Sequence, residues 1–318
     1  MDNRKFRLSI VIPVYNSQQT IGRLVDVLIE NLREYNFEVV LVNDCSKDNS
    51  HAICVQKCEE FPEIIRYMQL SRNFGEHNAV MAGLNHADGD YAIIMDDDFQ
   101  NPPEDVVKMI SHMIKNKFDV LYTYYEEKKH GWFRNIGSLF NDIVATLLLN
   151  KPKDLYLSSF KCINRFLINE IVKYRGPYPY IDGLILRVTQ NIGKVKVGHE
   201  ERTDGKSNYT LRKLVSLWMN MFINFSIVPI RISFFLGLVL TSFGFMLIFY
   251  FLIDMYILHP EGDWPPGWAS LLVCMITFSG AQLMSLGLIG EYIGKLFLTD
   301  NGTPQFIVSE YYEKNKTQ

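Results

Sequence analysis

The feature that most constrains the fold is a short apolar run, Tyr91–Met95, which ends directly in the acid triplet Asp96–Asp98. The run is too short for a helix, and the turn residues before it favour a buried strand of a parallel sheet. Open α/β sheets bind ligands at the carboxyl ends of their strands, which is where this acid falls. Adjacent carboxylates repel one another and need a counter-charge, and their hard oxygen atoms suit Mg²⁺ or Mn²⁺.

Side-chain alternation separates the members of the triplet. At a strand end, Asp96 and Asp98 point the same way and Asp97 points the other way. We therefore predict that Asp96 and Asp98 bind the metal, with Gln100 beside them. A solvated acidic turn is the alternative for an arbitrary acid triplet, but the apolar strand before this one favours the metal site.

Apolar strands alternate with helical patterns over the first part of the chain. The predicted strands are Leu8–Pro13, Phe37–Val42, Ile64–Leu70, Tyr91–Met95 and Phe118–Thr123, with helices over Thr20–Arg33, Asp48–Cys58, Glu76–His86 and Glu104–Lys115. This order predicts a doubly wound, mostly parallel α/β sheet of Rossmann-like type. The loops after the first, second and fourth strands then face one crevice, which would hold Tyr15, Asp44 and the acid triplet.

Several chemistries are disfavoured by what the sequence lacks. No Gly-x-Gly-x-x-Gly follows the first strand and there is no P-loop, which argues against dinucleotide redox chemistry and P-loop hydrolysis. A metal-bridged nucleotide diphosphate fits the acid triplet better, because the metal neutralises the leaving diphosphate. The net charge of −3 gives no general nucleic-acid footprint.

Two apolar stretches late in the chain have the length of membrane-spanning helices. Ile232–Ile253 and Gly267–Gly290 carry no charge over about 22 and about 24 residues, and a span needs ~20. A pair of buried core helices is the alternative. The linker between the stretches contains no Lys or Arg, whereas Arg231 and Lys295 flank the pair, so the positive-inside rule predicts that both termini are cytoplasmic.

Four further segments carry a resemblance to a known family. They are SIVIPVYN (9–16), LVNDCSKDNS (41–50), LSRNFGEHNAVMAGLNHADGDYAIIMDDDFQNPPE (70–104) and GKSNYTLRKL (205–214). Together they resemble the family-two glycosyltransferases of GT-A fold. Within that family they are most similar to the polyprenyl-phosphate glycosyltransferases, typified by dolichol-phosphate mannose synthase and its bacterial undecaprenyl-phosphate relatives. Asn43 and Cys45 depart from a family pattern that has two Asp, a Gly and a Ser, although Asp44 is present.

The apolar stretches and the resemblance together give a domain plan, and the resemblance implies a set of site residues. The plan is a GT-A catalytic domain over 1–210, an interfacial helix over 211–230, a two-helix transmembrane region over 231–298 and a cytoplasmic tail over 299–318. The implied metal and diphosphate site is Asp96, Asp98 and Gln100. The implied nucleotide-sugar contacts are Pro13, Tyr15, Val42, Asp44, Arg72, Asn73, Asp97, Arg202, Lys206 and Ser207.

A second departure concerns the acceptor. Relatives often have an acid followed by Phe-Arg where this chain has Ser159-Phe160-Lys161, so a proposed catalytic carboxylate is absent. Lys161 keeps a positive charge and, with Arg165, is predicted to meet the acceptor phosphate. A lipid phosphate is already an anion near neutral pH and can attack without a general base. Asp182 is a spare candidate acid, with a helix cap as the alternative.

We therefore predict an inverting glycosyltransferase that moves one sugar from a nucleotide-sugar to undecaprenyl phosphate. The donor that we predict first is a UDP-sugar. The resemblance implies a multi-pass protein of the bacterial inner membrane with a cytoplasmic catalytic domain, a role in cell-envelope polysaccharide synthesis, and a homo-oligomer. One alternative is a transferase that acts on another lipid-linked acceptor or on a protein. The other, suggested by Asn43, Cys45 and Ser159, is a non-catalytic membrane scaffold, against which the intact acid triplet argues.

Overall fold

The computed structural model describes residues 6–99, 101–124, 151–152, 155–198, single positions between 235 and 253, and 267–313. The chain forms two units, one of Met1–Leu211 together with Gly302–Gln318, and one of Arg212–Asn301. The predicted interfacial helix over 211–230 and the predicted site residues Gln100, Arg202, Lys206 and Ser207 lie outside the described residues.

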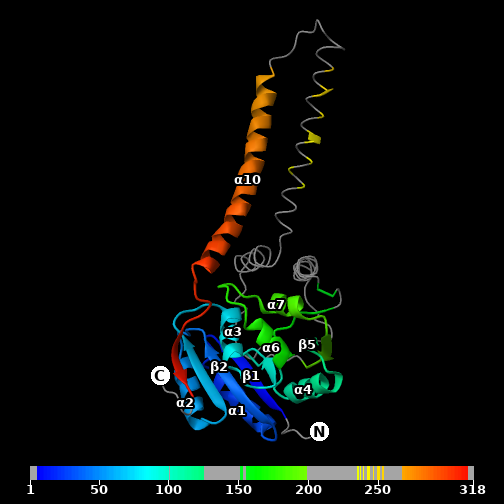
Figure 1. Cartoon of the computed structure of the whole chain (residues 1–318). Helices are drawn as coiled ribbons and strands as arrows, with labels where there is room; N and C mark the ends of the chain where they lie inside the picture. The colour runs from blue at the N-terminus through cyan, green and yellow to red at the C-terminus, as the bar shows by residue number, and fades with distance from the viewer. Residues whose placement is uncertain are drawn as a thin grey trace. The chain divides into compact units, whose positions relative to one another are not determined.

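Strands and helices alternate through most of the first unit (Figure 1). They are β1 (Arg7–Val14), α1 (Ile21–Leu32), β2 (Asn36–Asn43), α2 (Ser50–Glu60), β3 (Ile65–Leu70), α3 (Glu76–His86), β4 (Tyr91–Ile94), α4 (Asp105–Asn116), β5 (Val120–Tyr124), β6 (Lys161–Asn164), α6 (Arg165–Ile171), α7 (Ile181–Val188), β7 (Ile192–Lys196) and β8 (Val308–Tyr312). The predicted α/β class is confirmed.

The strands form one 8-stranded sheet in the order β7-β5-β6-β4-β1-β2-β3-β8. Strands β3, β2, β1 and β4 are parallel, while β6 lies antiparallel between β4 and β5. The chain moves from β1 to β2 on one side, and β4 joins β1 on the other. The carboxyl ends of β1 and β4 are therefore the topological switch point, where ligands bind in open α/β sheets.

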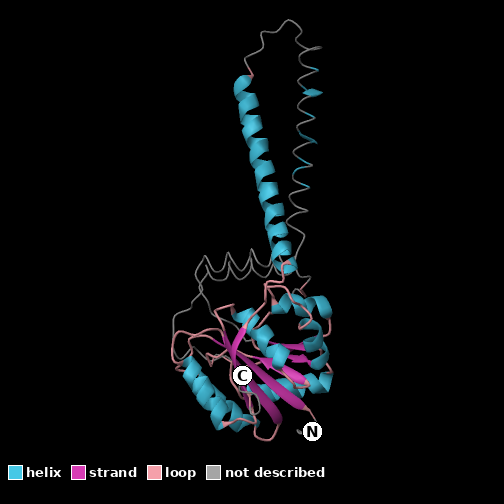
Figure 2. Ribbon diagram, turned by 60° about the vertical axis from the view of Figure 1, so that its left-hand side comes forward, coloured by secondary structure: helices cyan, strands magenta, loops and turns pink. Residues whose placement is uncertain are grey.

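Helices cover both faces of this sheet (Figure 2). On one face, α1, α2 and α4 share a core with the alternate β1 residues Leu8, Ile10 and Ile12. Helix α3 packs on the opposite face, where a Cβ at Gly83 would collide with the Val11 side chain. Because both faces are covered, the central strands are apolar throughout, as the sequence pattern indicated.

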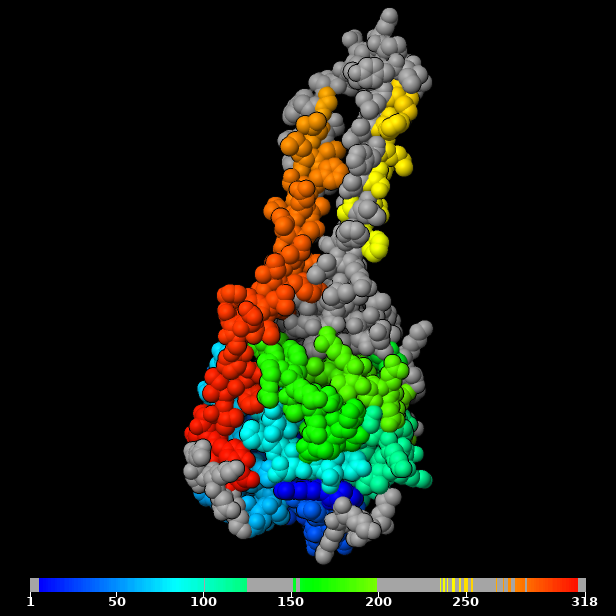
Figure 3. Space-filling view, viewed as in Figure 1, coloured from blue at the N-terminus to red at the C-terminus, as the bar shows by residue number. Residues whose placement is uncertain are grey.

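The C-terminal segment of the first unit differs from its expected form as a polar tail. Residues Val308–Tyr312 form β8, which pairs antiparallel with β3 at the edge of the sheet. The space-filling view shows this segment (red) on the surface of the unit (Figure 3). A short segment with polar side chains carries little strand signal by itself, so its place in the sheet follows from pairing with β3 rather than from local pattern.

The second unit contains one long described helix, α10 (Trp268–Asp300), which covers the predicted apolar stretch from residue 268 to residue 290. Across the described part of the chain, no helix meets the combined length and apolarity required to cross a membrane. The other apolar stretch, 232–253, is described only at single positions.

Candidate functional site

Two loops that leave the carboxyl ends of β1 and β2 are joined by reciprocal hydrogen bonds. The Asn16 backbone N–H donates to Ser46 Oγ at 2.9 Å, and the Lys47 N–H donates back to Asn16 Oδ1 at 2.8 Å. The Ser17 N–H donates to Ser50 Oγ at 2.8 Å. The polar residues after each strand therefore satisfy each other's backbone groups and fix the two loops as one surface.

Left-handed backbone is concentrated at this edge of the sheet. Asn16, Cys45 and Phe99 have φ values of 55°, 57° and 60°, and they follow β1, β2 and β4 respectively. Within the described residues, the only other residue of this kind, glycine aside, is Lys117. Such geometry costs roughly 1–2 kcal/mol per residue and tends to collect at functional sites. Cys45 occupies the position where the pattern it resembles has glycine, which adopts this geometry without strain.

Asp44 is buried at the end of this surface and braces the loop after β3. Its Oδ1 accepts the Phe74 N–H at 2.7 Å, and its Oδ2 accepts the Gly75 N–H at 2.8 Å. Burial raises the pKa of Asp44, and these two amide bonds offset only part of that rise. Beside it, Asn43 donates to the Tyr67 hydroxyl at 3.1 Å and accepts from Ser46, so a neutral amide suits this buried position.

The first two members of the acid triplet turn to opposite neighbours. Asp97 Oδ2 accepts the Tyr15 N–H at 3.2 Å and the Ser17 hydroxyl, which ties it to the loop after β1. Asp96 Oδ2 accepts the Ser159 hydroxyl at 2.6 Å, on the side of β6. The structure thus brings Tyr15 and the triplet together, and it assigns contacts to Ser17 and Ser159 that the sequence did not suggest.

Electrostatics at this edge are unbalanced. Desolvation, followed by repulsion from Glu76, raises the pKa of Asp96 to about 7, although Ser159 and Lys161 act in the opposite direction. Desolvation also raises the pKa of Asp97 to about 6, against the bonds from Ser17 and Tyr15. Desolvation raises the pKa of Glu76 as well, and the nearby Lys161 ammonium opposes this rise. Negative charge at this edge therefore exceeds the positive charge that the described side chains supply.

The described carboxylates do not make a complete metal site by themselves. No group of three or more His, Cys, Asp or Glu side chains in the described ranges is arranged to hold a metal ion. Asp97 is held by the Tyr15 N–H and the Ser17 hydroxyl. The half-buried carboxylates Asp96 and Asp98 are nevertheless the donor type that Mg²⁺ and Mn²⁺ prefer. They fit a divalent cation that takes its remaining ligands from a bound phosphate.

Lys161, which was predicted to meet the acceptor phosphate, is engaged by another carboxylate in this structure. It is 3% exposed and forms a buried ion pair with Asp182, which also accepts the Tyr122 hydroxyl at 2.8 Å. The Lys161 ammonium lies 5.2 Å from the centre of the Tyr122 ring. A buried ammonium needs a close anion, and Asp182, in the first turn of α7, supplies it. Lys161 therefore forms a buried ion pair in this structure, and its contact with an acceptor phosphate stays a prediction.

Arg165 lies at the opposite end of β4 from the acid triplet. Strand β6 runs antiparallel to β4, with Lys161 opposite Ile94 and Asn164 opposite Tyr91. Arg165 therefore lies at the amino end of β4, away from the triplet. There its Nη2 donates to the backbone carbonyls of Ala87, at 3.0 Å, and Gly89.

The remaining predicted donor contacts differ in their exposure. Val42 is fully buried in β2, whereas Tyr15 is 42% exposed. Arg72 and Asn73 are exposed, and the Arg72 guanidinium lies 4.6 Å from the centre of the Phe74 ring. Pro13 is half-buried at the end of β1. Val42 can thus contribute through its backbone, while Tyr15, Arg72 and Asn73 can offer side chains.

Comparison with known proteins places this geometry among glycosyltransferases. The sequence profile of glycosyl transferase family 2 matches residues 9–172. An undecaprenyl-phosphate 4-deoxy-4-formamido-L-arabinose transferase of Serratia proteamaculans is 29% identical over 307 residues, which cover 96% of this chain and 93% of that protein. The uncharacterized glycosyltransferase YkcC of Bacillus subtilis is 30% identical over 317 residues, or 98% of this chain and 95% of that protein.

Solved structures share the fold at low identity. Glucosyl-3-phosphoglycerate synthase from Mycobacterium tuberculosis, in complex with Mn²⁺, UDP and phosphoglyceric acid, superposes with a TM-score of 0.52 and 16% identity. The match covers 68% of this chain and 75% of that one. The complex of the same enzyme with UDP gives a TM-score of 0.51 and 17% identity over 68% of this chain and 77% of that one. These likenesses establish the architecture.

Proposed function

This chain belongs to glycosyl transferase family 2, and from that premise we propose that it moves one sugar, with inversion, from a nucleotide-sugar to a polyprenyl phosphate. The observation that carries the donor half is the acid triplet at the switch point, where desolvation by burial, followed for Asp96 by repulsion from Glu76, raises the pKa values of Asp96 and Asp97. The acceptor half rests on relatives matched over nearly their whole length, several of which are undecaprenyl-phosphate transferases.

In this proposal Asp96 and Asp98 hold a divalent cation, Mg²⁺ or Mn²⁺, with Gln100. When bound, the cation neutralises charge on the leaving diphosphate. The chain's own residues position the nucleotide: Asp97 fixes the backbone at Tyr15, and Asp44 fixes the loop at Phe74 and Gly75. Tyr15, Arg72 and Asn73 are exposed beside this surface for contact with the donor.

The acceptor must bring its own nucleophile to such a site. The Ser159 hydroxyl donates a hydrogen bond to Asp96, so Ser159 does not replace the missing carboxylate as a general base. Lys161 is likewise occupied by Asp182. A phosphate monoester is an anion near neutral pH, and its oxygen can attack the sugar without prior removal of a proton. The protein then contributes orientation and exclusion of water.

A membrane acceptor suits the second unit. Helix α10 has 33 residues, so it is about 50 Å long at 1.5 Å per residue and exceeds the roughly 30 Å hydrocarbon core. Among its described side chains, the large apolar ones that are exposed are Leu271, Met275, Phe278, Leu283, Leu286, Ile289, Ile293, Leu296 and Phe297. Our proposal is that α10 and Ile232–Ile253 cross the bacterial inner membrane, with the catalytic domain on the cytoplasmic side.

The test is transfer of a radiolabelled sugar by the purified full chain in detergent. UDP-, GDP- and dTDP-sugars are supplied in turn with undecaprenyl phosphate and Mn²⁺ or Mg²⁺. The proposal expects label in the organic phase with one donor, loss of that label with EDTA, and loss with Asp96→Asn. The control Glu38→Gln, at the opposite edge of the sheet, should transfer normally. Absence of organic-phase label across the whole panel would refute the proposal.

A further inference from the structure

The segment that follows α10 makes one buried polar contact before it enters the sheet. Within residues 301–313, all of which the structure describes, Gln305 is the only buried side chain, at 7% exposure. Its Nε2 donates to the Gly176 carbonyl at 2.9 Å and to the Tyr174 carbonyl at 3.4 Å. A primary amide has two N–H donors, and here both are used on the backbone of the connection between α6 and α7.

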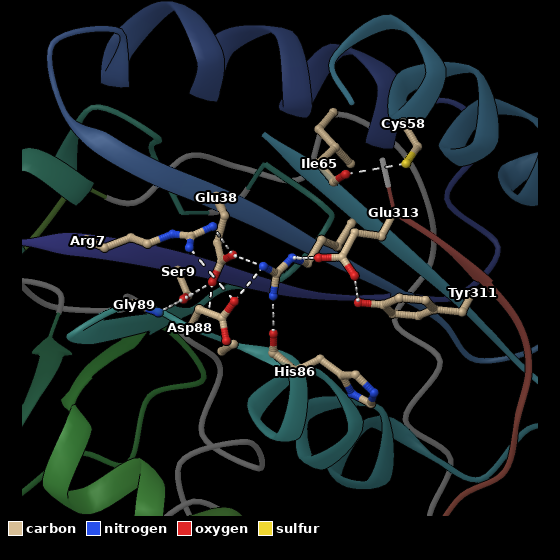
Figure 4. Close-up of polar contacts among 12 residues, drawn as sticks. Arg7, Ser9, Glu38, Cys58, Ile65, His86, Asp88, Gly89, Tyr311 and Glu313 are labelled. Carbon is tan, nitrogen blue, oxygen red and sulfur yellow. Dashed lines mark hydrogen bonds and ion pairs between the residues drawn. The ribbon is translucent and has the colours of Figure 1, made fainter. Parts of the chain in front are cut away.

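The rest of the C-terminal segment is attached separately. The Ser71 N–H donates to the Ile307 carbonyl at 2.9 Å, and Ser309 Oγ donates to the Gln69 carbonyl at 3.1 Å. At the far end, Glu313 pairs with Arg66 at 3.0 Å (Figure 4). Strand β8 is therefore attached through contacts that do not involve Gln305, and the Gln305 amide contacts a different part of the unit.

That part is the loop of residues 174–180. Gly176 is buried, and a Cβ there would collide with the Tyr174 hydroxyl, so the loop is closely packed on itself. Two of its residues contact the start of α3: the Pro177 carbonyl accepts Asn78 Nδ2 at 3.5 Å, and the Tyr180 ring meets the His77 ring edge-to-face at 5.2 Å. Gln305 therefore holds a loop that in turn holds the first turn of α3.

The first turn of α3 borders the donor side of the site. Asp44 accepts the N–H groups of Phe74 and Gly75 immediately before it, and Glu76 lies close enough to raise the pKa of Asp96. Asn78 Oδ1 is buried and has no hydrogen-bond partner among the described residues. A buried acceptor without a partner is costly, so Asn78 stays in place because its neighbours, including the 174–180 loop, hold it there.

We infer that Gln305 is a positioning residue for the transfer reaction. Its amide fixes residues 174–180, and through His77 and Asn78 this loop fixes the start of α3 beside the nucleotide site. The inference rests on the proposed function, because the role proposed for Gln305 is to support binding of the nucleotide-sugar donor. The sequence also places this contact only a few residues after Asp300, the last residue of α10.

The experiment compares Gln305→Leu, which keeps the shape but removes both donors, with Glu313→Gln, which weakens the attachment of β8 to Arg66 without touching the loop. In the full chain, Gln305→Leu should raise KM for the nucleotide-sugar and weaken UDP binding in the presence of Mn²⁺ by about tenfold, since two hydrogen bonds are lost. Its kcat should stay within about threefold, because the reacting groups remain. Glu313→Gln should change each quantity by less than about twofold.

Hydrogen exchange on the same proteins provides a readout that does not depend on turnover. Exchange at residues 174–180 and in the first turn of α3 should rise in Gln305→Leu and not in Glu313→Gln. Equal exchange in the two variants overturns the inference, and so does raised exchange with unchanged KM and UDP affinity. If the wild-type chain transfers no sugar although Gln305→Leu shows the exchange pattern, the proposed function fails first and the catalytic part of this role falls with it.

Discussion

Two groups of acidic residues lie at opposite edges of the same sheet and have opposite electrostatics. At the amino edge, Glu38 is 1% exposed and pairs with Arg7 at 2.7 Å (Figure 4). Glu38 also pairs with Arg66 at 3.4 Å. Arg66 also contacts Asp88 at 2.5 Å. Burial tends to raise the pKa of Asp88, but the bond from Arg66 and the nearby arginines bring it below its usual value.

The carboxyl edge has the reverse balance. Among the described residues, Asp96 and Asp97 form no ion pair, and their pKa values rise to about 7 and about 6. The two edges differ in partners rather than in residue type: guanidinium groups neutralise one cluster, and serine hydroxyls and a backbone amide hold the other without neutralising it. Acid that the fold itself compensates is structural, whereas acid left uncompensated is available to a cation and its ligand.

The largest expected effect comes from removal of charge at the uncompensated edge. Asp96→Asn should lower kcat/KM for sugar transfer by about a thousandfold, because a group that stabilises the reacting charges is lost. The same change relieves repulsion, so the thermal midpoint should hold steady or rise. Transfer assays and thermal unfolding on one preparation check both. A variant that keeps a tenth of the activity would contradict the assignment.

The next effect is on stability at the compensated edge. Glu38→Gln leaves Arg7 and Arg66 without their buried anion, which should lower the free energy of unfolding by about 3 kcal/mol. Transfer activity of the folded protein should stay within about twofold of wild type. The check is chemical denaturation followed by fluorescence, together with kcat/KM at a temperature where both proteins are folded. A large activity loss with little destabilisation would break the distinction between the edges.

The two edges should also respond differently to pH. The folded-state pKa of Asp96 exceeds its unfolded value, so the native state binds the proton more tightly and stability falls as pH rises from about 4 to about 7. The pKa of Asp88 is lowered, so its contribution is present above about 4 and is lost on acidification. Without divalent cations, the thermal midpoint should therefore decrease from pH 5 to pH 7.5, less steeply in Asp96→Asn and as in wild type in Asp88→Asn. If the thermal midpoint changes equally with pH in all three proteins, Asp96 does not cause the loss of stability at higher pH.

The smallest effect concerns backbone strain at the carboxyl edge. Cys45 has φ of 57°, which glycine adopts readily. Cys45→Gly should therefore stabilise the fold by about 1 kcal/mol, less the entropy that glycine loses on folding. Denaturation midpoints measured beside Cys54→Ala, a buried control without this geometry, provide the comparison. A destabilised Cys45→Gly would show that the cysteine side chain contributes packing that outweighs the strain.

Most of the fold could be predicted because its signals are local. The first five strands are apolar runs between turn residues, and α1 places Ile21, Leu24, Val25, Leu28 and Leu32 on one buried face. The antiparallel insertion of β6 and the pairing of β8 with β3 could not be predicted, since each depends on residues far away in the chain. Strand ends were enough to bring three loops together, because parallel strands share one carboxyl edge.

The sequence pattern does not predict which side chains contact one another at the site. A charge in a sequence does not reveal the direction in which it points, so Lys161 turns inward to Asp182 although its charge suggested a phosphate contact. Arg165 lies at the amino end of β4 because β6 runs antiparallel to β4, a direction that the sequence does not reveal. Ser159, noted only for the acid it replaces, donates to Asp96, a contact visible only once β6 lies beside β4.

Mn²⁺ binding in the presence of UDP tests the central claim most directly. Electron paramagnetic resonance measures free Mn²⁺ as the full chain is titrated, with wild type, Asp96→Asn and Glu38→Gln compared at pH 7.5. The account predicts one UDP-dependent Mn²⁺ site in wild type and in Glu38→Gln, and its loss in Asp96→Asn. Equal binding by all three proteins, or none by the wild type, would contradict the assignment of the cation to the carboxyl edge of the sheet.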